Sequence, residues 1–242
     1  MSASYVPERA MFIYAHPDDI EFSCGGTAAK WAKAGCEVTY VLITDGNIGS
    51  HDRTLTAEAL TKIRHVEQRA AAAVAGVKQC IFMGHHDGLL EPTLALRKEL
   101  VKLIRTHKPN VVVSGDPRSH FPSDTYINHP DHRAAARAVV EAVFPAVEMR
   151  LLYTEFEDEG IFPHKPNYVY ISGPEDANLF IDISDTIETK IEALRQHAPS
   201  QFAEWDPEPM IREWASNTGK KVGYPYAEKF RRFVLQEVET KA

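Results

Sequence analysis

The sequence predicts an α/β fold with a mostly parallel central sheet, and three observations support this fold class. Short apolar runs rich in β-branched and aromatic residues alternate with segments of helical periodicity from Ala10 to Phe144. The connections are long enough for the right-handed crossovers that join parallel strands. Polar side chains gather directly after the strands, at the edge where open α/β sheets bind ligands. A length of 242 residues, of which 44% are hydrophobic and 25% charged, suits one domain over residues 1–242.

Strands and helices follow one another regularly in the first part of the chain. Gly35 and Gly76 are placed to end the first two helices, and Pro130 suits the first position of the fourth. A polar loop over residues 115–128 precedes that fourth helix, and loops of this length tend to be functional. We expect strands at residues 10–14, 37–44, 79–84 and 110–114, and helices at residues 25–35, 56–74, 94–106 and 130–144.

The second part of the chain alternates less regularly. Runs of β-branched and aromatic residues predict strands at residues 150–155, 168–171 and 179–182. Ser184 is expected to cap a helix that runs to about His197, and residues 199–214 should mix loop and helix. Residues 230–235 fit either a last edge strand or a helix.

Charge and cysteine content narrow the classes of partner and compartment. The chain has 27 Lys and Arg against 34 Asp and Glu, a formal charge of −7, so a nucleic-acid partner is not expected. Cys24, Cys36 and Cys80 form no C-x-x-C pair, which fits reduced thiols in a cytoplasmic protein. No apolar run reaches the roughly 18 residues of a membrane span, so we expect no membrane association.

The first motif runs from Tyr14 to Asp19, directly after the first predicted strand. His16 and Asp19 are three residues apart, so in a tight turn or a first helical turn both side chains can face one point, which suits a metal ion. Asp18 points elsewhere, in the position where a general base for a metal-bound water would be placed.

The second motif is His-Pro-Asp-His at residues 129–132, at the start of a predicted helix. His129 and His132 share one face of that helix. Together His16, Asp19 and His132 would form a zinc site of two histidines and one carboxylate with an open position for water, which is the usual pattern of catalytic zinc.

The remaining residues of the two motifs suggest hydrolysis. Zinc would lower the pKa of the water to about 7, and Asp18 could accept its proton. His129 could donate a hydrogen bond or positive charge to the oxyanion that forms when hydroxide attacks a carbonyl group. Asp131 has two possible roles. It would either orient an imidazole behind the metal, or it would only be a carboxylate in the first helical turn that the helix dipole stabilises.

Two further residues are weaker candidates. Asp87 follows the third predicted strand and therefore belongs to the same edge of the sheet. Arg64 and Glu67 are three residues apart on the polar side of a predicted helix. That spacing alone is typical of a solvated salt bridge worth a few tenths of a kcal/mol.

The two motifs together resemble the PIG-L/LmbE-like zinc-dependent deacetylases, which remove acetyl groups from N-acetylglucosaminyl compounds. The resemblance covers most of the chain and includes residues 44–46, 64–67, 87–88 and 197–201. It implies a Rossmann-like three-layer sandwich and one zinc ion per chain, although another divalent metal such as Fe²⁺ would also fit. It implies roles for seven residues: zinc binding by His16, Asp19 and His132, general base catalysis by Asp18, oxyanion stabilisation by His129, and substrate contacts by Arg64 and Asp87.

The resemblance also implies a small-molecule partner, an N-acetylated sugar conjugate. It does not decide whether the protein is a homo-oligomer. The role of His197 also stays open, and so does the question whether residues 118–126 select the substrate. An amide of a non-sugar or thiol-sugar conjugate is an alternative substrate.

Three other classes of protein are alternatives. A nonhaem iron(II) oxygenase uses the same ligand types, but the spare carboxylate favours hydrolysis. A nucleotide-binding protein would need G-x-G-x-x-G, and only Gly25 and Gly26 are present. A sugar-binding protein without activity is disfavoured because all five central residues are present.

Overall fold

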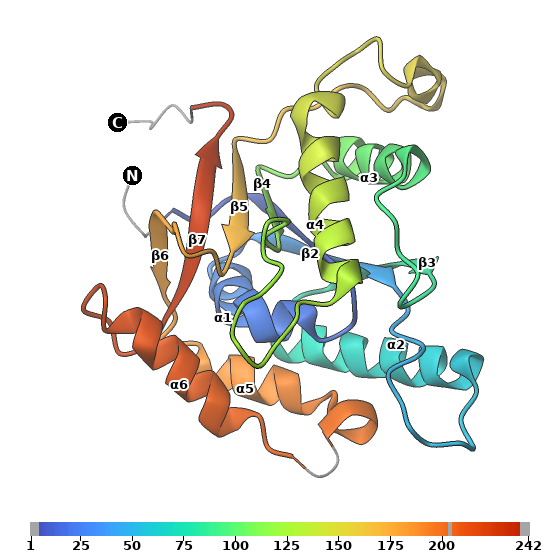
Figure 1. Ribbon diagram of the computed structural model, residues 1–242. Coiled ribbons are helices and arrows are strands. Elements are labelled where there is room, and N and C mark those ends of the chain that lie inside the picture. Colours follow the sequence, from blue (N-terminus) through green and yellow to red (C-terminus); the bar gives the residue numbers. More distant parts are fainter. Residues whose placement is uncertain (1–4, 203–204, 238–242) are drawn as a thin grey trace.

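The computed structural model describes residues 5–202 and 205–237. The described residues form a seven-stranded sheet in the order β3-β2-β1-β4-β5-β7-β6 (Figure 1). Neighbouring strands from β3 to β5 in this order pair in parallel, whereas β7 runs antiparallel to both β5 and β6. The strands are β1 (Arg9–Tyr14), β2 (Glu37–Thr44), β3 (Gln79–His85), β4 (Val111–Ser114), β5 (Tyr168–Ser172), β6 (Leu179–Asp182) and β7 (Ala227–Val234).

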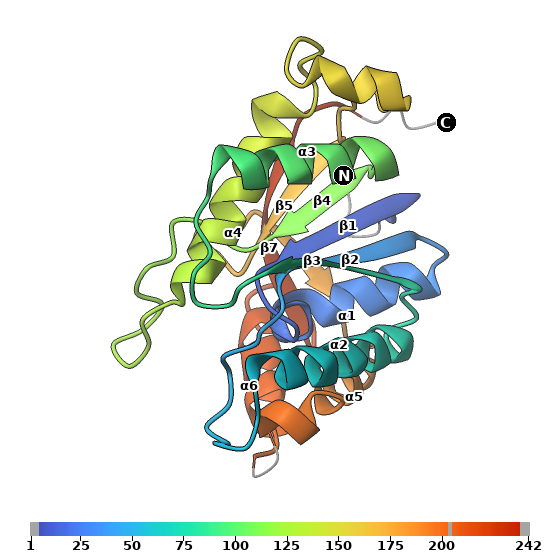
Figure 2. The ribbon, with the colours of Figure 1, turned by 90° about the vertical axis from the view of Figure 1, so that its right-hand side faces the viewer.

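Helices cover both faces of the sheet, which makes three layers (Figure 2). The helices are α1 (Asp19–Lys33), α2 (Ala57–Val74), α3 (Leu94–His107), α4 (Pro130–Glu141), α5 (Ile187–Arg195) and α6 (Glu208–Gly219). One hydrophobic core lies under α3 and α4, and the other contains side chains of α1, α5 and α6. The predicted α/β class and the mostly parallel sheet are confirmed. Among the described residues, no helix is both long and apolar enough to cross a membrane.

The order of the strands fixes where polar side chains can meet. Strand β1 lies between β2 and β4, and the chain leaves β1 and β4 toward helices on opposite faces of the sheet. Such a switch point leaves a crevice at the carboxyl ends of the two strands, and ligands of open α/β sheets bind there. Residues 15–19 and 115–132, which carry both sequence motifs, follow these two strands.

Helix α1 begins six residues earlier than predicted and is broken at Cys24, where φ is −149° and ψ is 22°. The break frees backbone N–H groups of the following turn, as a helix start does. Buried Glu228 of β7 accepts these N–H groups, from Gly26 at 3.0 Å and from Thr27 at 2.7 Å. Lys190 of α5 donates to Glu228 at 2.5 Å and to the carbonyl oxygen of Phe22 at 3.0 Å, so both sides of the break are satisfied.

The strand predicted at residues 150–155 is wrong. These residues form turns that lead into a 3-10 helix at Thr154–Glu159. Buried Arg105 of α3 donates to four main-chain carbonyl oxygens at 2.9 to 3.1 Å, those of Ala146, Val147, Met149 and Leu152. The last of these carbonyls lies within the predicted strand, and its bond to Arg105 takes it out of any strand ladder and curls the chain back toward α3.

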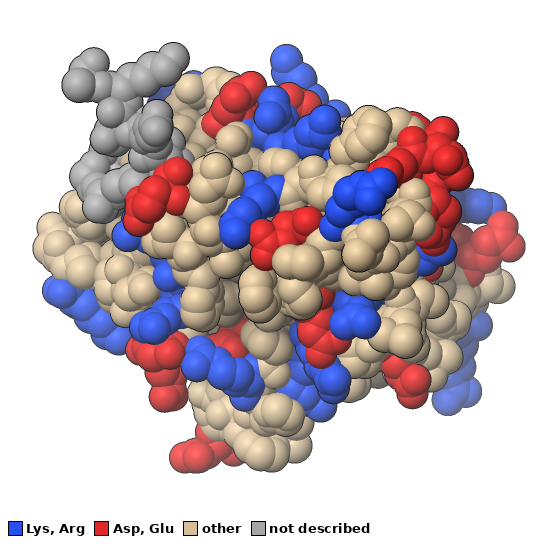
Figure 3. All heavy atoms as spheres, turned by 90° about the horizontal axis from the view of Figure 1, so that it is seen from above, with Lys and Arg blue, Asp and Glu red and all other residues tan. Residues whose placement is uncertain are grey.

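Ion pairs hold the same 3-10 helix to α3. Lys98 lies 2.5 Å from Glu155, and Lys102 lies 2.6 Å from Glu159. Figure 3 shows the molecule from above, with positive and negative side chains interspersed over this face.

Other predicted boundaries need smaller corrections. Ser184 does not cap the helix α5, because its hydroxyl and N–H bind Asp182 in a turn and the helix begins at Ile187. Helix α4 ends at Glu141 and continues as a π-helical turn over Ala142–Ala146. The segment left open at residues 230–235 is largely strand, part of β7, and it lies between β5 and β6 rather than at the edge.

Candidate active site

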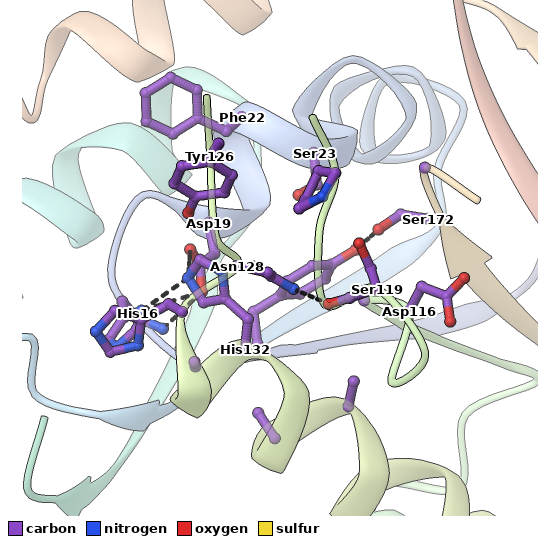
Figure 4. A pocket seen from close by; sticks show the side chains of 18 of the residues that line it. His16, Asp19, Phe22, Ser23, Asp116, Ser119, Tyr126, Asn128, His132 and Ser172 are labelled. Atoms are coloured by element: carbon purple, nitrogen blue, oxygen red, sulfur yellow. Dashed lines mark hydrogen bonds and ion pairs between the residues drawn. The ribbon is translucent and has the colours of Figure 1, made fainter. Parts of the chain in front are cut away.

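A cavity of about 1800 Å³ opens at the carboxyl ends of β1 and β4. The turn after β1 contributes His16, Asp18 and Asp19, and the start of α4 contributes His129 and His132. Asp87, from the loop after β3, lines it as well, and so does Arg64 of α2. Figure 4 shows His16 and Asp19, from the turn after β1, pointing toward His132 of α4.

Three potential ligand atoms converge within the cavity. His132 Nε2 lies 3.1 Å from His16 Nδ1 and 3.0 Å from Asp19 Oδ1. His16 Nδ1 lies 3.5 Å from the other oxygen of Asp19. Ligands about 2.0–2.1 Å from a tetrahedral zinc ion are about 3.3 Å from one another. The spacing of the donor atoms therefore fits a metal ion.

Hydrogen bonds to one ring nitrogen of His132 and of His16 leave the other ring nitrogen, which faces Asp19, free to bind a metal ion. His132 Nδ1 lies 2.9 Å from Asn128 Oδ1, an acceptor, so the proton belongs on Nδ1 and the lone pair on Nε2. His16 Nε2 lies 3.0 Å from Asp87 Oδ1 and 3.3 Å from Asp131 Oδ2, which leaves the lone pair on Nδ1. Both free lone pairs face Asp19. Carboxylates and carbonyl-type oxygens in this outer position are typical of metal sites.

The charges around the cavity also favour a cation. Burial by itself lowers the pKa of His16, but hydrogen bonds with Asp131 and Asp19 outweigh burial and raise the pKa to about 12. Burial raises the pKa of Asp19, yet His132 and His16 hold it well below its usual range. The surroundings thus stabilise positive charge between these side chains, which a divalent metal ion would supply.

His129 lies beside this group in a different role. Its ring centre is 4.7 Å from that of His16, and its Nδ1 accepts the N–H of Asp131 at 3.2 Å. The proton must then be on Nε2, which makes this nitrogen a donor and not a ligand. Burial and the neighbouring His16 lower the pKa of His129, so the ring is neutral. Distance alone would also admit a group of His16, His129 and His132 as ligands, but this tautomer argues against it.

Asp18 is held from several directions. Its φ of +93° lies in the left-handed region, which is uncommon for a residue other than glycine. Its N–H donates to Gln68 Oε1 at 2.9 Å, and its carboxylate accepts from Arg64 Nη2 at 2.8 Å. Burial raises the pKa of Asp18 to about 6 against the opposing effect of Arg64. A carboxylate with a raised pKa beside a metal site suits a general base.

Arg64 is buried and is not the solvated surface residue that its spacing from Glu67 suggests. Besides Asp18, it donates to the carbonyl oxygens of Gly46 and Pro17. Glu67 instead accepts from Ser200. The guanidinium therefore fixes the geometry of the Asp18 turn, and its Nε has no partner in the described structure.

Sequence reasoning missed two residues of the site. Asn128 sets the tautomer of His132, and its place directly before the second motif was the available signal. Gln68 holds the Asp18 turn from α2 and in turn donates to buried Glu21 at 2.9 Å. His197, whose role was open, lies fully buried 3.5 Å from Glu21 and does not line the cavity.

Comparisons with known proteins agree with this geometry. Residues 11–143 match the family model PIG-L, GlcNAc-PI de-N-acetylase. The chain is 35% identical over 237 residues to diacetylchitobiose deacetylase of Thermococcus kodakarensis, covering 93% of this chain and 82% of that protein. It is 29% identical over 207 residues to a probable N-acetyl-alpha-D-glucosaminyl L-malate deacetylase 2 of Bacillus anthracis, covering 81% and 82%.

A solved deacetylase structure is also similar to this protein. N,N'-diacetylchitobiose deacetylase from Pyrococcus horikoshii, complexed with an inhibitor, superposes with a TM-score of 0.86 at 32% identity, covering 94% of this chain and 84% of that one. The PIG-L deacetylases are metal-dependent amide hydrolases, and the described residues include a group of histidines and carboxylates able to hold a metal ion. The chain therefore belongs to the PIG-L deacetylase family.

Proposed function

We propose that this protein is a zinc-dependent hydrolase that removes the acetyl group from an N-acetylglucosamine conjugate. The observation that supports it best is the convergence of His16 Nδ1, Asp19 and His132 Nε2 beside the carboxylate of Asp18. Two histidines and one carboxylate with a remaining open position are the ligand pattern of catalytic zinc. The curated relatives named above are deacetylases of N-acetylated sugars, which supports the choice of substrate class.

The chain's own residues supply the proton transfers. Zinc held by the three ligands would polarise the substrate carbonyl and lower the pKa of a water molecule. Asp18 accepts the proton of the attacking water and can then deliver it to the amine that leaves. His129 Nε2–H donates to the carbonyl oxygen as negative charge develops on it. The neutral ring of His129 makes this a hydrogen bond rather than an ion pair.

Arg64 and Asp87 are proposed substrate contacts, because both line the cavity. Their internal bonds limit what they can offer. Arg64 is buried and already donates to Asp18, Gly46 and Pro17, and its Nε–H is buried without a partner among the described residues. Asp87 binds His16 through Oδ1 and accepts the Ile48 N–H at 3.4 Å through Oδ2, so it orients a ligand histidine as well.

The cellular compartment and the oligomeric state of the protein are also proposals. Cys24, Cys36 and Cys80 are free thiols, which supports a reducing compartment, the cytoplasm. A homo-oligomer remains a proposal that sedimentation can test, with a monomer as the contrary result.

The test is amine release from N-acetylglucosamine derivatives by metal-stripped protein, with and without added zinc. We expect hydrolysis only when zinc is present, and one zinc ion bound per chain. Fe²⁺ is the comparison metal, and oxygen consumption with Fe²⁺ would instead favour an oxygenase. Zinc binding without amine release would reject the acetyl-sugar substrate, and absence of zinc binding would reject the site.

A further inference from the structure

A chain of three buried polar side chains leads to the turn that carries Asp18. They are Glu21 of α1, Gln68 of α2 and His197, which follows α5, and each is 0% exposed. The three helices cover the same face of the sheet (Figure 2). None of the three side chains lines the cavity. Because they are fully buried, their polar atoms need partners within the protein.

The backbone of Asp18 has to be held in its conformation. A φ of +93° persists in a residue other than glycine only where the surrounding structure fixes it. The Asp18 N–H donates to Gln68 Oε1 at 2.9 Å, whereas Arg64 binds the carboxylate of Asp18. Gln68 therefore has to present its amide oxygen to the turn. With the amide reversed, two N–H donors would face each other and the turn would lose this support.

Glu21 determines which way the Gln68 amide faces. Gln68 Nε2 donates to Glu21 Oε1 at 2.9 Å, so the amide oxygen is left for Asp18. His197 Nε2 lies 3.5 Å from the other oxygen, Glu21 Oε2. Neither this oxygen nor a ring nitrogen of His197 has a hydrogen bond to any other described residue. A proton shared by the pair therefore lies between Oε2 and Nε2, and Oε1 remains an acceptor whichever partner carries the proton.

We propose that Glu21 and His197 are positioning residues for Asp18, the proposed general base. They fix the Gln68 amide with its oxygen toward the Asp18 N–H, and this bond keeps the Asp18 carboxylate at the cavity. This inference rests on the proposed deacetylase function, in which Asp18 accepts a proton, and it gives His197 a part in the reaction through Glu21 and Gln68.

The first test compares Glu21→Leu with Glu21→Gln in the zinc-saturated, full-length protein. Leucine has no acceptor, so the buried Gln68 donor loses its partner and the amide reverses or moves away. The population of the held turn, and with it kcat for N-acetylglucosamine, should fall about tenfold to a hundredfold, with KM unchanged. Glutamine still offers an oxygen to Gln68 and should retain kcat within about threefold. Equal loss in both variants, or wild-type kcat in Glu21→Leu, would overturn the inference.

A double-mutant cycle tests whether Glu21 acts through Gln68. Gln68→Met removes both hydrogen bonds of the amide and should lower kcat about tenfold to a hundredfold. The double variant Glu21→Leu, Gln68→Met should be no slower than Gln68→Met, because the residue through which Glu21 acts is already gone. Losses that multiply would show that Glu21 acts by another route.

His197 is tested by a similar comparison. His197→Leu leaves Glu21 Oε2 buried without a partner and should lower kcat about threefold to tenfold. His197→Gln can still donate to Glu21 and should restore most of that loss. If both variants are equally slow, His197 does not act through Glu21.

Leu100→Ala is the matched control for a loss of stability alone. Leu100 is 0% exposed and packs in the hydrophobic core under α3, so its replacement should lower Tm by about 10 °C and change neither kcat nor KM. Glu21→Leu should show the reverse, a Tm within about 5 °C of the wild type and a low kcat, because an apolar side chain can replace a buried charged one at little cost. Loss of zinc from Glu21→Leu would place the effect on Asp19 and overturn the inference.

Hydrogen exchange measured by NMR does not depend on activity. The Asp18 amide should exchange about tenfold to a hundredfold faster in Glu21→Leu, whereas the Thr27 amide, held by Glu228, should not change. If the wild type releases no amine but this exchange difference is found, the proposed function is wrong and the positioning of Asp18 stands. If amine is released and Glu21→Leu matches the wild type in kcat and exchange, the inference is wrong and the function stands.

Discussion

Two groups of buried charged side chains lie along helix α1, and they are built on different principles. At the break in α1, Lys190 and Glu228 are each only 4% exposed in their side chains and use their hydrogen-bonding groups on each other and on the helix backbone. At the start of α1, four aspartates converge with one arginine and three histidines beside an open cavity. The first group completes the fold, whereas the second is the group that we propose binds a cation from outside.

The difference teaches how to separate structural from functional burial of charge. A buried pair whose partners are all internal stabilises the native backbone and gains nothing from a ligand. A cluster with more carboxylates than internal cations is costly until a metal ion binds, so its free energy depends on solution conditions. Substitutions in the two groups should therefore affect different measurements.

Glu228→Gln should have the largest effect on stability. The amide oxygen can still accept an N–H of the helix, but the buried Lys190 charge loses its partner, which costs about 3 kcal/mol of unfolding free energy. Urea denaturation measures the loss. The double variant Lys190→Met, Glu228→Gln should recover part of it, because no unpaired charge remains. If the double variant is no more stable than the single one, the pairing argument fails.

Asp18→Asn should abolish most activity at a smaller cost in stability than Glu228→Gln, because buried Arg64 loses its charged partner but keeps its bonds to the carbonyl oxygens of Gly46 and Pro17. Asparagine tolerates a φ of +93° well, whereas removal of the base should lower kcat at least about 100-fold. Zinc content, measured on the purified protein, should stay at the wild-type level. Unchanged turnover would remove Asp18 from the mechanism.

The two histidines of α4 should behave differently from each other. His132→Ala should lose zinc, and with it the rise in unfolding free energy that zinc gives, about 2.7 kcal/mol at a zinc concentration 100 times Kd. His129→Ala should keep zinc and that rise but lose about 100-fold in rate. Thermal unfolding with and without zinc, beside metal analysis, distinguishes the two. The opposite pattern would mean that their assignments are exchanged.

Arg64→Gln should change the pH dependence of the reaction. Arg64 opposes the rise in the pKa of Asp18 that burial causes, so its removal raises that pKa further. The base acts only when deprotonated, and the acidic limb of kcat/KM should move about one unit to higher pH. A profile that keeps its acidic limb would show that another group controls it.

Local signals in the sequence predicted most of the parallel sheet and its helices. Residues 37–44 form β2 with the predicted bounds, and the helix predicted at residues 56–74 is α2, which runs over Ala57–Val74 with Thr56 as its N-cap. The wrong strand at residues 150–155 had the right composition, but the contact with Arg105 comes from α3, far away in the sequence. Composition could not choose between strand and helix for residues 230–235 either, because the choice depends on β5 and β6 as neighbours.

In the site, too, local sequence predicted some features and distant contacts set the others. The residue types and spacing of both motifs were enough to predict metal-ligand chemistry. The hydrogen bonds that choose a tautomer, such as Asn128 with His132, depend on loop geometry. The sequence did not predict the break of α1, because Gly26 fitted the start of a helix. Packing requires a glycine at position 26, since a Cβ there would lie 2.9 Å from Cδ1 of Ile183.

The position of β7 has a consequence for biosynthesis. This strand is made after every other strand described, yet it is inserted between β5 and β6 and supplies Glu228 to the break in α1. A nascent chain cannot finish its sheet, or fix the helix that carries Asp19, before residue 234 has left the ribosome. Ribosome-bound chains that lack β7 should therefore bind the metal poorly, and tight binding would be delayed until β7 has been made.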